Sequence, residues 1–326
     1  MLISVVVPCY NEQEVLPMFH SKLTDVLGKM CQKEEGLDYE VLFADDGSAD
    51  ITLQKLRDLA KKDRHVKYIS LSRNFGKEAA IYAGLEHSLG DFVVVMDADL
   101  QHPPMFLPQM YGYVRDGNYD CTAARRVNRA GESITRSWFA GLFYKLMNKY
   151  SDINLVDGSQ DFRFMSRRMV DAVLSMKETR RFSKGIFSWV GFRTKYIEYP
   201  NTQRVAGKTS WSFKKLLAYS LDGICSFSTS PLNVPVVLGA LMCIASVISF
   251  IIMVIYYAGS HEFMFGSLYY TVTLWAVINT VVLVGGIVTG CLGVVGQYIS
   301  RTFMEVKNRP IYIAKEMNLK RINSDE

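Results

Sequence analysis

The stretch Val94-Val95-Met96-Asp97-Ala98-Asp99-Leu100-Gln101 sets two carboxylates and an amide directly after a strongly apolar run. Such a run predicts a buried β-strand with the polar residues at its carboxyl end. Carboxylate and amide oxygens there suit a Mg²⁺ or Mn²⁺ ion that takes its remaining ligands from water and a diphosphate. The alternative is a pair of solvated loop acids, because Asp-x-Asp is a common pattern.

Four apolar, β-rich runs form a series along the first third of the chain: Ile3–Pro8, Val41–Ala44, Val66–Leu71 and Phe92–Met96. They alternate with helical patterns at about Glu14–Met30, Ile51–Lys62, Glu78–Leu89 and Met105–Arg115. This alternation predicts a parallel sheet covered by helices on both faces, in which ligands bind beyond the carboxyl ends of the strands. We expect the polar residues after each run to share one edge: Asn11–Glu12, Asp45–Asp46, Arg73–Asn74 and Asp97–Asp99.

Two long runs in the last third, Pro231–Ser260 and Phe263–Ser300, contain no Lys, Arg, Asp or Glu. Each exceeds the roughly 20 residues that cross a bilayer, which predicts two transmembrane helices at about 232–257 and 271–298. Core helices of a soluble enzyme are the alternative. Basic residues before the first span and after the second predict a multi-pass protein of the cytoplasmic membrane, with both termini in the cytoplasm.

The composition agrees with a partly membrane-embedded protein, since the 326 residues are 49% hydrophobic and only 21% charged. The net charge of +5, placed beside the predicted spans, favours anionic lipid head groups over nucleic acid as the partner. The six cysteines show no metal-ligand spacing and fit a reducing compartment. The apolar amino terminus has no basic region before it, so it predicts a first strand and not a signal peptide.

Four motifs stand in the order seen in the inverting glycosyltransferases of family 2, which have the GT-A fold. They are Val7-Pro8-Cys9-Tyr10-Asn11-Glu12, Asp45-Asp46-Gly47-Ser48, Asp97-Ala98-Asp99-Leu100-Gln101 and Gln160-Asp161-Phe162-Arg163. With two carboxy-terminal spans, the chain resembles the polyprenyl-phosphate branch, which includes bactoprenol glucosyltransferases and dolichol-phosphate mannose synthases. The resemblance covers essentially the whole chain.

The resemblance implies an α/β fold, with a GT-A, Rossmann-like nucleotide-diphospho-sugar transferase domain in the cytoplasm over residues 1–207. An interfacial amphipathic helix over residues 208–230 is expected next, with a helix packed on the globular core as the alternative. The two-helix hairpin over residues 231–300 and a cytoplasmic tail over residues 301–326 complete the chain. A glycine stripe between Gly286 and Gly296 permits close helix packing, within the hairpin or in a homo-oligomer.

The resemblance also implies a donor site. It assigns the nucleoside and sugar of the donor to Pro8, Tyr10, Glu12, Asp45, Asp46 and Asp97. It assigns the metal to Asp97, Asp99 and Gln101, and the donor diphosphate to Arg204 and Lys208 on a mobile loop. A turn role remains the alternative for Asp46, and Lys77 either touches substrate or only starts a helix.

On the acceptor side, Asp161 matches the position assigned to the general base, and it either removes a proton or orients the acceptor. The candidates for binding the acceptor phosphate are Arg125, Arg126, Arg136 and Arg163, because guanidinium groups match phosphate oxygens. A phosphate monoester is mostly ionised at neutral pH, so strong help from a base is not required. His102, with no second His or Cys at ligand spacing, is expected to lie outside the metal's ligand set.

The expected reaction is transfer of a single sugar, with inversion, from a nucleotide sugar to undecaprenyl or another polyprenyl phosphate at the cytoplasmic membrane face. UDP-glucose is favoured as the donor over a GDP-sugar such as GDP-mannose, because the two-span hairpin resembles the bactoprenol glucosyltransferases. A processive polysaccharide synthase would need more spans and a Gln-x-x-Arg-Trp motif, which the sequence lacks. A non-catalytic membrane sensor of sugar nucleotides is a third alternative.

Overall fold

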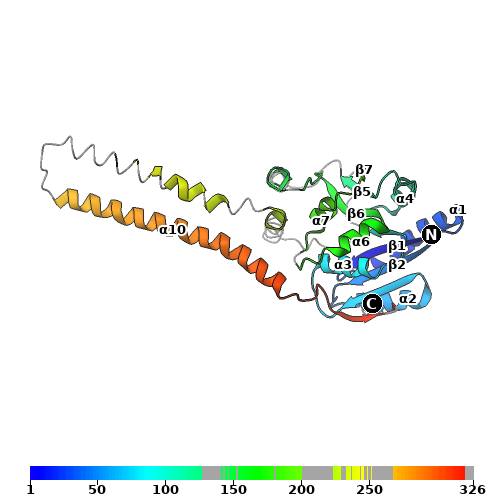
Figure 1. Ribbon diagram of the computed structural model, residues 1–326. Coiled ribbons are helices and arrows are strands. Elements are labelled where there is room, and N and C mark those ends of the chain that lie inside the picture. The colour runs from blue at the N-terminus through cyan, green and yellow to red at the C-terminus, as the bar shows by residue number, and fades with distance from the viewer. Residues whose placement is uncertain are drawn as a thin grey trace. The chain divides into compact units, whose positions relative to one another are not determined.

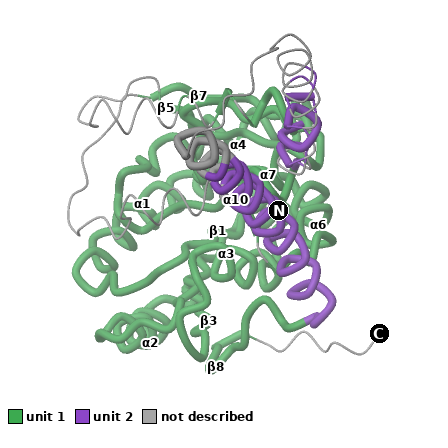
Figure 2. Tube along the Cα trace, turned by 90° about the vertical axis from the view of Figure 1, so that its left-hand side faces the viewer, with its two compact units in different colours: residues 1–227, 309–326 green, residues 228–308 purple. Residues whose placement is uncertain are grey.

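The computed structural model describes residues 1–126, 153–179, 181–199 and 267–319, with shorter stretches between residues 141 and 151 and between residues 223 and 251. These residues fall into two compact units. The first unit contains Met1–Phe227 and Arg309–Glu326, and the second contains Ser228–Asn308 (Figure 2). The chain therefore leaves the first unit and returns to it at its end, a return that the sequence analysis did not foresee.

The first unit is built on one eight-stranded sheet with the order β7-β5-β6-β4-β1-β2-β3-β8 (Figure 1). The strands are β1 (Leu2–Cys9), β2 (Asp38–Asp45), β3 (Val66–Leu71), β4 (Phe92–Val95), β5 (Cys121–Arg126), β6 (Ser159–Ser166), β7 (Thr194–Tyr199) and β8 (Ala314–Met317). Strands β1 to β4 pair in parallel, whereas β6 runs antiparallel to β4 and β5, and β8 antiparallel to β3. The four strands predicted from apolar runs are confirmed.

Helices cover both faces of this sheet (Figure 1). They are α1 (Leu16–Lys33), α2 (Thr52–Lys62), α3 (Lys77–Glu86), the 3₁₀ turn η1 (Pro104–Phe106), α4 (Leu107–Arg115), α6 (Arg167–Ser175) and α7 (Ser183–Trp189). Alternate residues of β1 enter different cores: Val5 packs with residues of α1 and α4, while Val6 packs with residues of α3, α6 and α7. This burial on both faces explains why the strands are apolar almost throughout.

Helix α3 lies against the centre of the sheet through a glycine. A Cβ atom added at Gly84 would come within 2.2 Å of the side chain of Val6, closer than van der Waals contact permits. The close approach fixes the height of α3 above β1. It thereby sets where the first residue of the helix, Lys77, meets the sheet edge.

The carboxy-terminal segment completes the far edge of the sheet. Strand β8 pairs with β3, and Glu316 accepts hydrogen bonds from Arg57 Nε at 2.7 Å and from the Tyr68 hydroxyl at 2.8 Å. Asn318 continues the attachment, because its side chain bonds the backbone of Tyr68 and of Val66. The range 301–326, expected to form a tail, thus contributes a strand to the sheet of the first unit.

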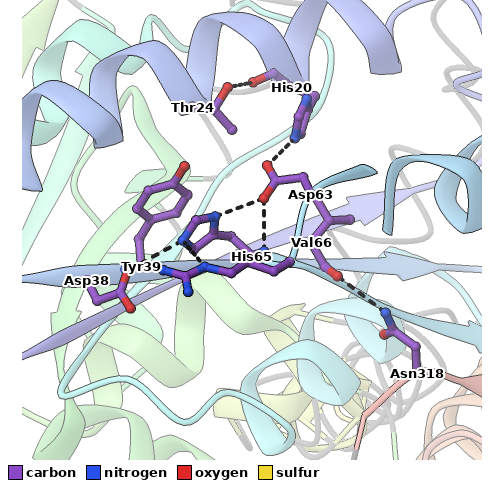
Figure 3. Close-up of polar contacts among 9 residues, drawn as sticks. His20, Thr24, Asp38, Tyr39, Asp63, His65, Val66 and Asn318 are labelled. Carbon is purple, nitrogen blue, oxygen red and sulfur yellow. Dashed lines mark hydrogen bonds and ion pairs between the residues drawn. The ribbon is translucent and has the colours of Figure 1, made fainter. Parts of the chain in front are cut away.

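A polar cluster lies beside this attachment (Figure 3). The carboxylate of Asp63, at the end of α2, contacts His20 of α1 at 3.0 Å and His65 at 2.8 Å. These contacts and the backbone N–H of His65 lower the pKa of Asp63 even though burial acts to raise it. The ring of His65 stacks on Tyr39 of β2. The cluster therefore ties α1, α2 and the start of β3 to one carboxylate.

The second unit contains the 40-residue helix α10 (Ser267–Val306). Within the described residues, one helical segment, Leu283–Val306, is long and apolar enough to cross a membrane, and none of its most apolar part is buried. Helix α10 includes the whole of the second predicted span. The first predicted span, at 232–257, is described only in short helical pieces, and the predicted amphipathic helix falls largely outside the described residues, so the two-helix hairpin stays a prediction.

We predict that Glu316→Gln weakens the attachment of β8. Arg57 and Tyr68 hold the pKa of Glu316 down at about 2. Because the folded pKa is depressed, this stabilisation is present above the ordinary carboxyl pKa of about 4.3 and disappears as the pH falls towards 2. At pH 7 the variant should therefore have a Tm about 2–4 °C lower in detergent.

The control is Lys61→Gln, an exposed lysine in the last turn of α2, which should leave the Tm unchanged. The difference between wild type and Glu316→Gln should shrink steadily as the pH is lowered from 5 to 3. A difference that stays constant over this range would contradict the assignment.

Candidate active site

The register between β4 and β6 brings two acids together. The pairs Phe92 with Ser166 and Val95 with Arg163 are antiparallel partners. Continuing that register by two residues sets Asp97 opposite Asp161. Side chains of directly opposite residues point to the same face of a sheet, and like charges there repel. Asp97, which the sequence predicts to contact the donor, and Asp161, which it predicts to act on the acceptor, therefore lie next to each other.

A lysine lies between these two acids. Lys77 Nζ is 2.8 Å from Asp97 Oδ1 and 2.6 Å from Asp161 Oδ2. Burial acts to lower the pKa of Lys77, but Asp161 and Asp97 outweigh it and raise the pKa. Burial likewise acts to raise the pKa of Asp161, and the nearby positive charges hold that pKa well below its usual range. Asp161 is thus a carboxylate throughout the physiological pH range.

The loop after β4 holds the other members of its motif. Asp99 Oδ1 accepts a hydrogen bond from the backbone N–H of Gln101 at 3.1 Å, and Leu100 between them has a φ of 58°. Gln101 Oε1 accepts a hydrogen bond from Arg126 Nη2 at 3.1 Å. The loop therefore keeps Asp99 and Gln101 in one tight turn at the end of the strand.

This oxygen set fits a hard cation that the protein holds only in part. Among the residues that the structure describes, no three His, Cys, Asp or Glu side chains are grouped to hold a metal ion. Two carboxylates and an amide leave about half of the roughly six ligands that Mg²⁺ requires to water and to a bound diphosphate. His102 is buried and stacks on Phe162, and within the described part of the chain neither of its ring nitrogens has a hydrogen-bond partner. Burial lowers its pKa, so the ring is neutral.

The first strand ends in an open hollow. A cavity of about 450 Å³ is lined by Asn11, Glu12, Gln13, Glu14, Val15, Ala49 and Asp50. Asn11, with a φ of 55°, shapes this wall, since its side chain accepts a hydrogen bond from the backbone N–H of Ala49 at 2.9 Å. Of the residues predicted to bind the nucleoside, Glu12 lines the hollow. Pro8 is buried in β1 and Tyr10 is 45% exposed.

Asp45 and Asp46 are both buried, and their oxygens are occupied by the protein. Asp45 accepts hydrogen bonds from the backbone of Ser48 at 3.1 Å and the hydroxyl of Ser70 at 2.7 Å. Asp46 accepts from the backbone N–H groups of Phe75 at 2.7 Å and Gly76 at 2.9 Å. Asp46 therefore fixes the loop that leads into α3, and the bonds it accepts come from that loop and not from its own Asp-Asp-Gly-Ser turn.

The arginines proposed for the acceptor phosphate have different surroundings. Arg125 is paired with Glu198 at 3.1 Å, and Arg126 bonds Gln101. Arg163 is only 3% exposed, lies over the ring of Phe187 and bonds the hydroxyl of Ser159. Arg136, Arg204 and Lys208 lie outside the described residues, and their roles stay predictions.

The sequence analysis missed the full extent of the positive charge around Asp161. Lys184 of α7 acts on Asp161 together with Lys77 and Arg163. Lys184 lies in a helix far along the chain, and no local motif marks it. From the sequence, Lys77 could be predicted only to touch substrate or to start a helix. Its partners follow β4 and belong to β6, and the pairing of these two strands cannot be predicted from a local pattern.

We predict that Asp46→Ala loosens the loop from Ser72 to Gly76. The variant leaves two backbone N–H groups without their acceptor, which costs on the order of 1–3 kcal/mol. Local opening of the loop should rise accordingly, and trypsin should cleave after the exposed Arg73 about tenfold faster. Asp58→Ala, an exposed acid on α2, is the control; equal cleavage rates in the two variants would contradict the role of Asp46.

Known proteins resemble this chain over most of its length. The bactoprenol glucosyl transferase of Shigella phage SfII is 36% identical, covering 97% of this chain and 98% of that protein. CsbB of Bacillus subtilis (strain 168), named as a glycosyltransferase, is 42% identical over 98% of this chain and 92% of its own length. Among solved structures, glucosyl-3-phosphoglycerate synthase from Mycobacterium tuberculosis, in complex with Mn²⁺ and UDP-glucose, has a TM-score of 0.40 and 20% identity, covering 68% of this chain and 75% of that chain. The model of glycosyl transferase family 2 matches residues 4–174, and the chain belongs to this family.

Proposed function

We propose that the protein moves a single glucose from UDP-glucose to the phosphate of a polyprenyl phosphate at the cytoplasmic face of the membrane, with inversion at the anomeric carbon. The observation that supports this most directly is the meeting of Asp97 and Asp161 at one ammonium group. One acid belongs to the loop that fits a cation and diphosphate, and the other faces it across β4 and β6. A sugar held near both acids would face the leaving diphosphate on the side of Asp97 and the acceptor on the side of Asp161.

The choice of acceptor rests on relatives and on the apolar helix. Relatives named as bactoprenol glucosyl transferases are 35–36% identical over nearly the full chain, and bactoprenol is a polyprenyl lipid. A polyprenyl phosphate must be met at a membrane surface, which suits a chain with an apolar segment of 24 residues. We infer that a second span near 232–257 completes a hairpin and keeps both termini in the cytoplasm.

The residues have separate tasks in this reaction. Asp97, Asp99 and Gln101 would hold a Mg²⁺ or Mn²⁺ ion, which stabilises the charge that the leaving diphosphate gains. The hollow beside Glu12 would receive the nucleoside, and Arg204 and Lys208 would close on the diphosphate. The acceptor's phosphate oxygen is already ionised near neutral pH, so Asp161 orients groups around it and removes no proton.

The test is to incubate the purified protein in detergent with undecaprenyl phosphate, Mg²⁺ or Mn²⁺, and one labelled UDP- or GDP-sugar at a time. We expect label from UDP-glucose alone to enter the organic extract. Label that enters a water-soluble polymer instead would point to a processive synthase. Donor binding with no transfer would point to a sensor.

We predict that Asp99→Ala lowers the transfer rate by at least about 10²-fold, because the diphosphate loses a metal ligand as it leaves. The Tm should change little, since Asp99 lies on the loop after β4, outside the paired strands of the sheet. Asp116→Ala, an exposed acid at the end of α4, serves as the matched control. Transfer by Asp99→Ala at close to the wild-type rate would refute the metal site.

A further inference from the structure

Lys77 has a position that its helix does not explain. It is the first residue of α3, and a positive charge at the amino end of a helix opposes the helix dipole. A lysine is therefore a poor choice if the residue only starts the helix. Its side chain instead reaches the edge of the sheet, where it lies between Asp97 and Asp161 and remains 36% exposed.

Lys77 and a divalent cation would use the same carboxylate. Both oxygens of Asp97 lie within 2.9 Å of Lys77 Nζ. The proposed site for Mg²⁺ or Mn²⁺ includes Asp97 as a ligand, and a carboxylate oxygen that coordinates a cation has less negative charge to offer an ammonium group. Lys77 and the cation therefore compete for Asp97, while Asp161 at 2.6 Å holds the lysine in place.

An ammonium group has three N–H donors, and that of Lys77 lies against both oxygens of Asp97 and one of Asp161. The donors directed at Asp97 would become available once a cation takes that carboxylate. The arginines of β5 are turned to other partners, since Arg125 pairs with Glu198 and Arg126 bonds Gln101. Lys77 is the cation that directly contacts Asp161 in the described part of the chain. A dianionic phosphate that approaches a sugar beside Asp161 requires a positive charge at that point.

We propose that Lys77 is a contact of the acceptor phosphate, held by Asp161 so that its ammonium group donates to the phosphate oxygens as one of them attacks the sugar. This inference rests on the proposed function. In the step, an ionised phosphate oxygen of the acceptor forms a bond to the anomeric carbon. The bond from that carbon to the β-phosphate oxygen breaks, and UDP leaves with the electron pair, so no proton is transferred. Asp161 is then a positioning residue that acts through Lys77.

The test compares Lys77→Gln, Lys77→Arg and, as a control, Lys61→Gln on helix α2. Three quantities are measured in the full-length protein in detergent: the KM for undecaprenyl phosphate, the KM for UDP-glucose, and the Kd of Mn²⁺ from the electron paramagnetic resonance signal of the free ion. Lys77→Gln should lower kcat/KM for the lipid phosphate by about 10²-fold and change the KM for UDP-glucose less than about threefold. Its Mn²⁺ Kd should be unchanged or lower, because a competing cation is gone.

Lys77→Arg keeps the charge and should recover at least about a tenth of the wild-type kcat/KM for the lipid phosphate. The proposal is overturned if Lys77→Gln binds Mn²⁺ and UDP-glucose more weakly, if its kinetics with the lipid phosphate match those of Lys61→Gln, or if it fails to fold. Weaker binding of Mn²⁺ and UDP-glucose would give Lys77 a role with the donor, and failure to fold would give it a role in the fold. Kinetics like those of Lys61→Gln would give it no role in the transfer. If the wild type itself transfers no sugar to undecaprenyl phosphate, the proposed function fails first.

Discussion

Antiparallel pairing of β4 with β6 sets two carboxylates opposite each other at the edge of the sheet, and the rest of the site depends on this constraint. Two like charges at that spacing and depth repel, so the fold must supply a cation between them. Lys77 supplies it from a helix whose height is fixed by the contact of Gly84 with Val6. The central core of the sheet thus positions the charges at its edge.

The central strands could be predicted from the sequence because each is buried on both faces and reads as an apolar run. The carboxyl ends of β1, β2 and β4 could be predicted with them, together with the acids that follow. The pairing of β6 could not be predicted in this way. Three of the four residues in its motif Gln160-Asp161-Phe162-Arg163 are polar, and its partner strand lies more than sixty residues away. Only the register reveals that Asp161 faces Asp97.

Strand β8 shows a second limit of the sequence pattern. Its four residues, Ala-Lys-Glu-Met, carry no β-branched or aromatic side chain and no alternation, so propensity gives no reason for a strand. The strand is held by contacts with distant residues: Glu316 bonds Arg57, 259 residues earlier in the chain, and Ala314 and Met317 pack against the core formed by β2, β3 and α3. Contacts at this sequence distance are invisible to local patterns. Their effect is to cover the edge of β3, which would otherwise present unpaired backbone groups.

The charges around Asp161 also bear on the chemistry that the site can perform. A general base must hold a proton at some point in the reaction, and it works best when its pKa lies near the working pH. Burial acts to raise the pKa of Asp161, but the surrounding cations outweigh it and hold this pKa well below its usual range, far from neutral pH. A hydroxyl acceptor would need a general base to remove its proton, and Asp161 with so low a pKa is a poor one. A phosphate acceptor instead brings an oxygen that is already ionised. The electrostatics that keep two acids side by side therefore favour a phosphate as the group that receives the sugar.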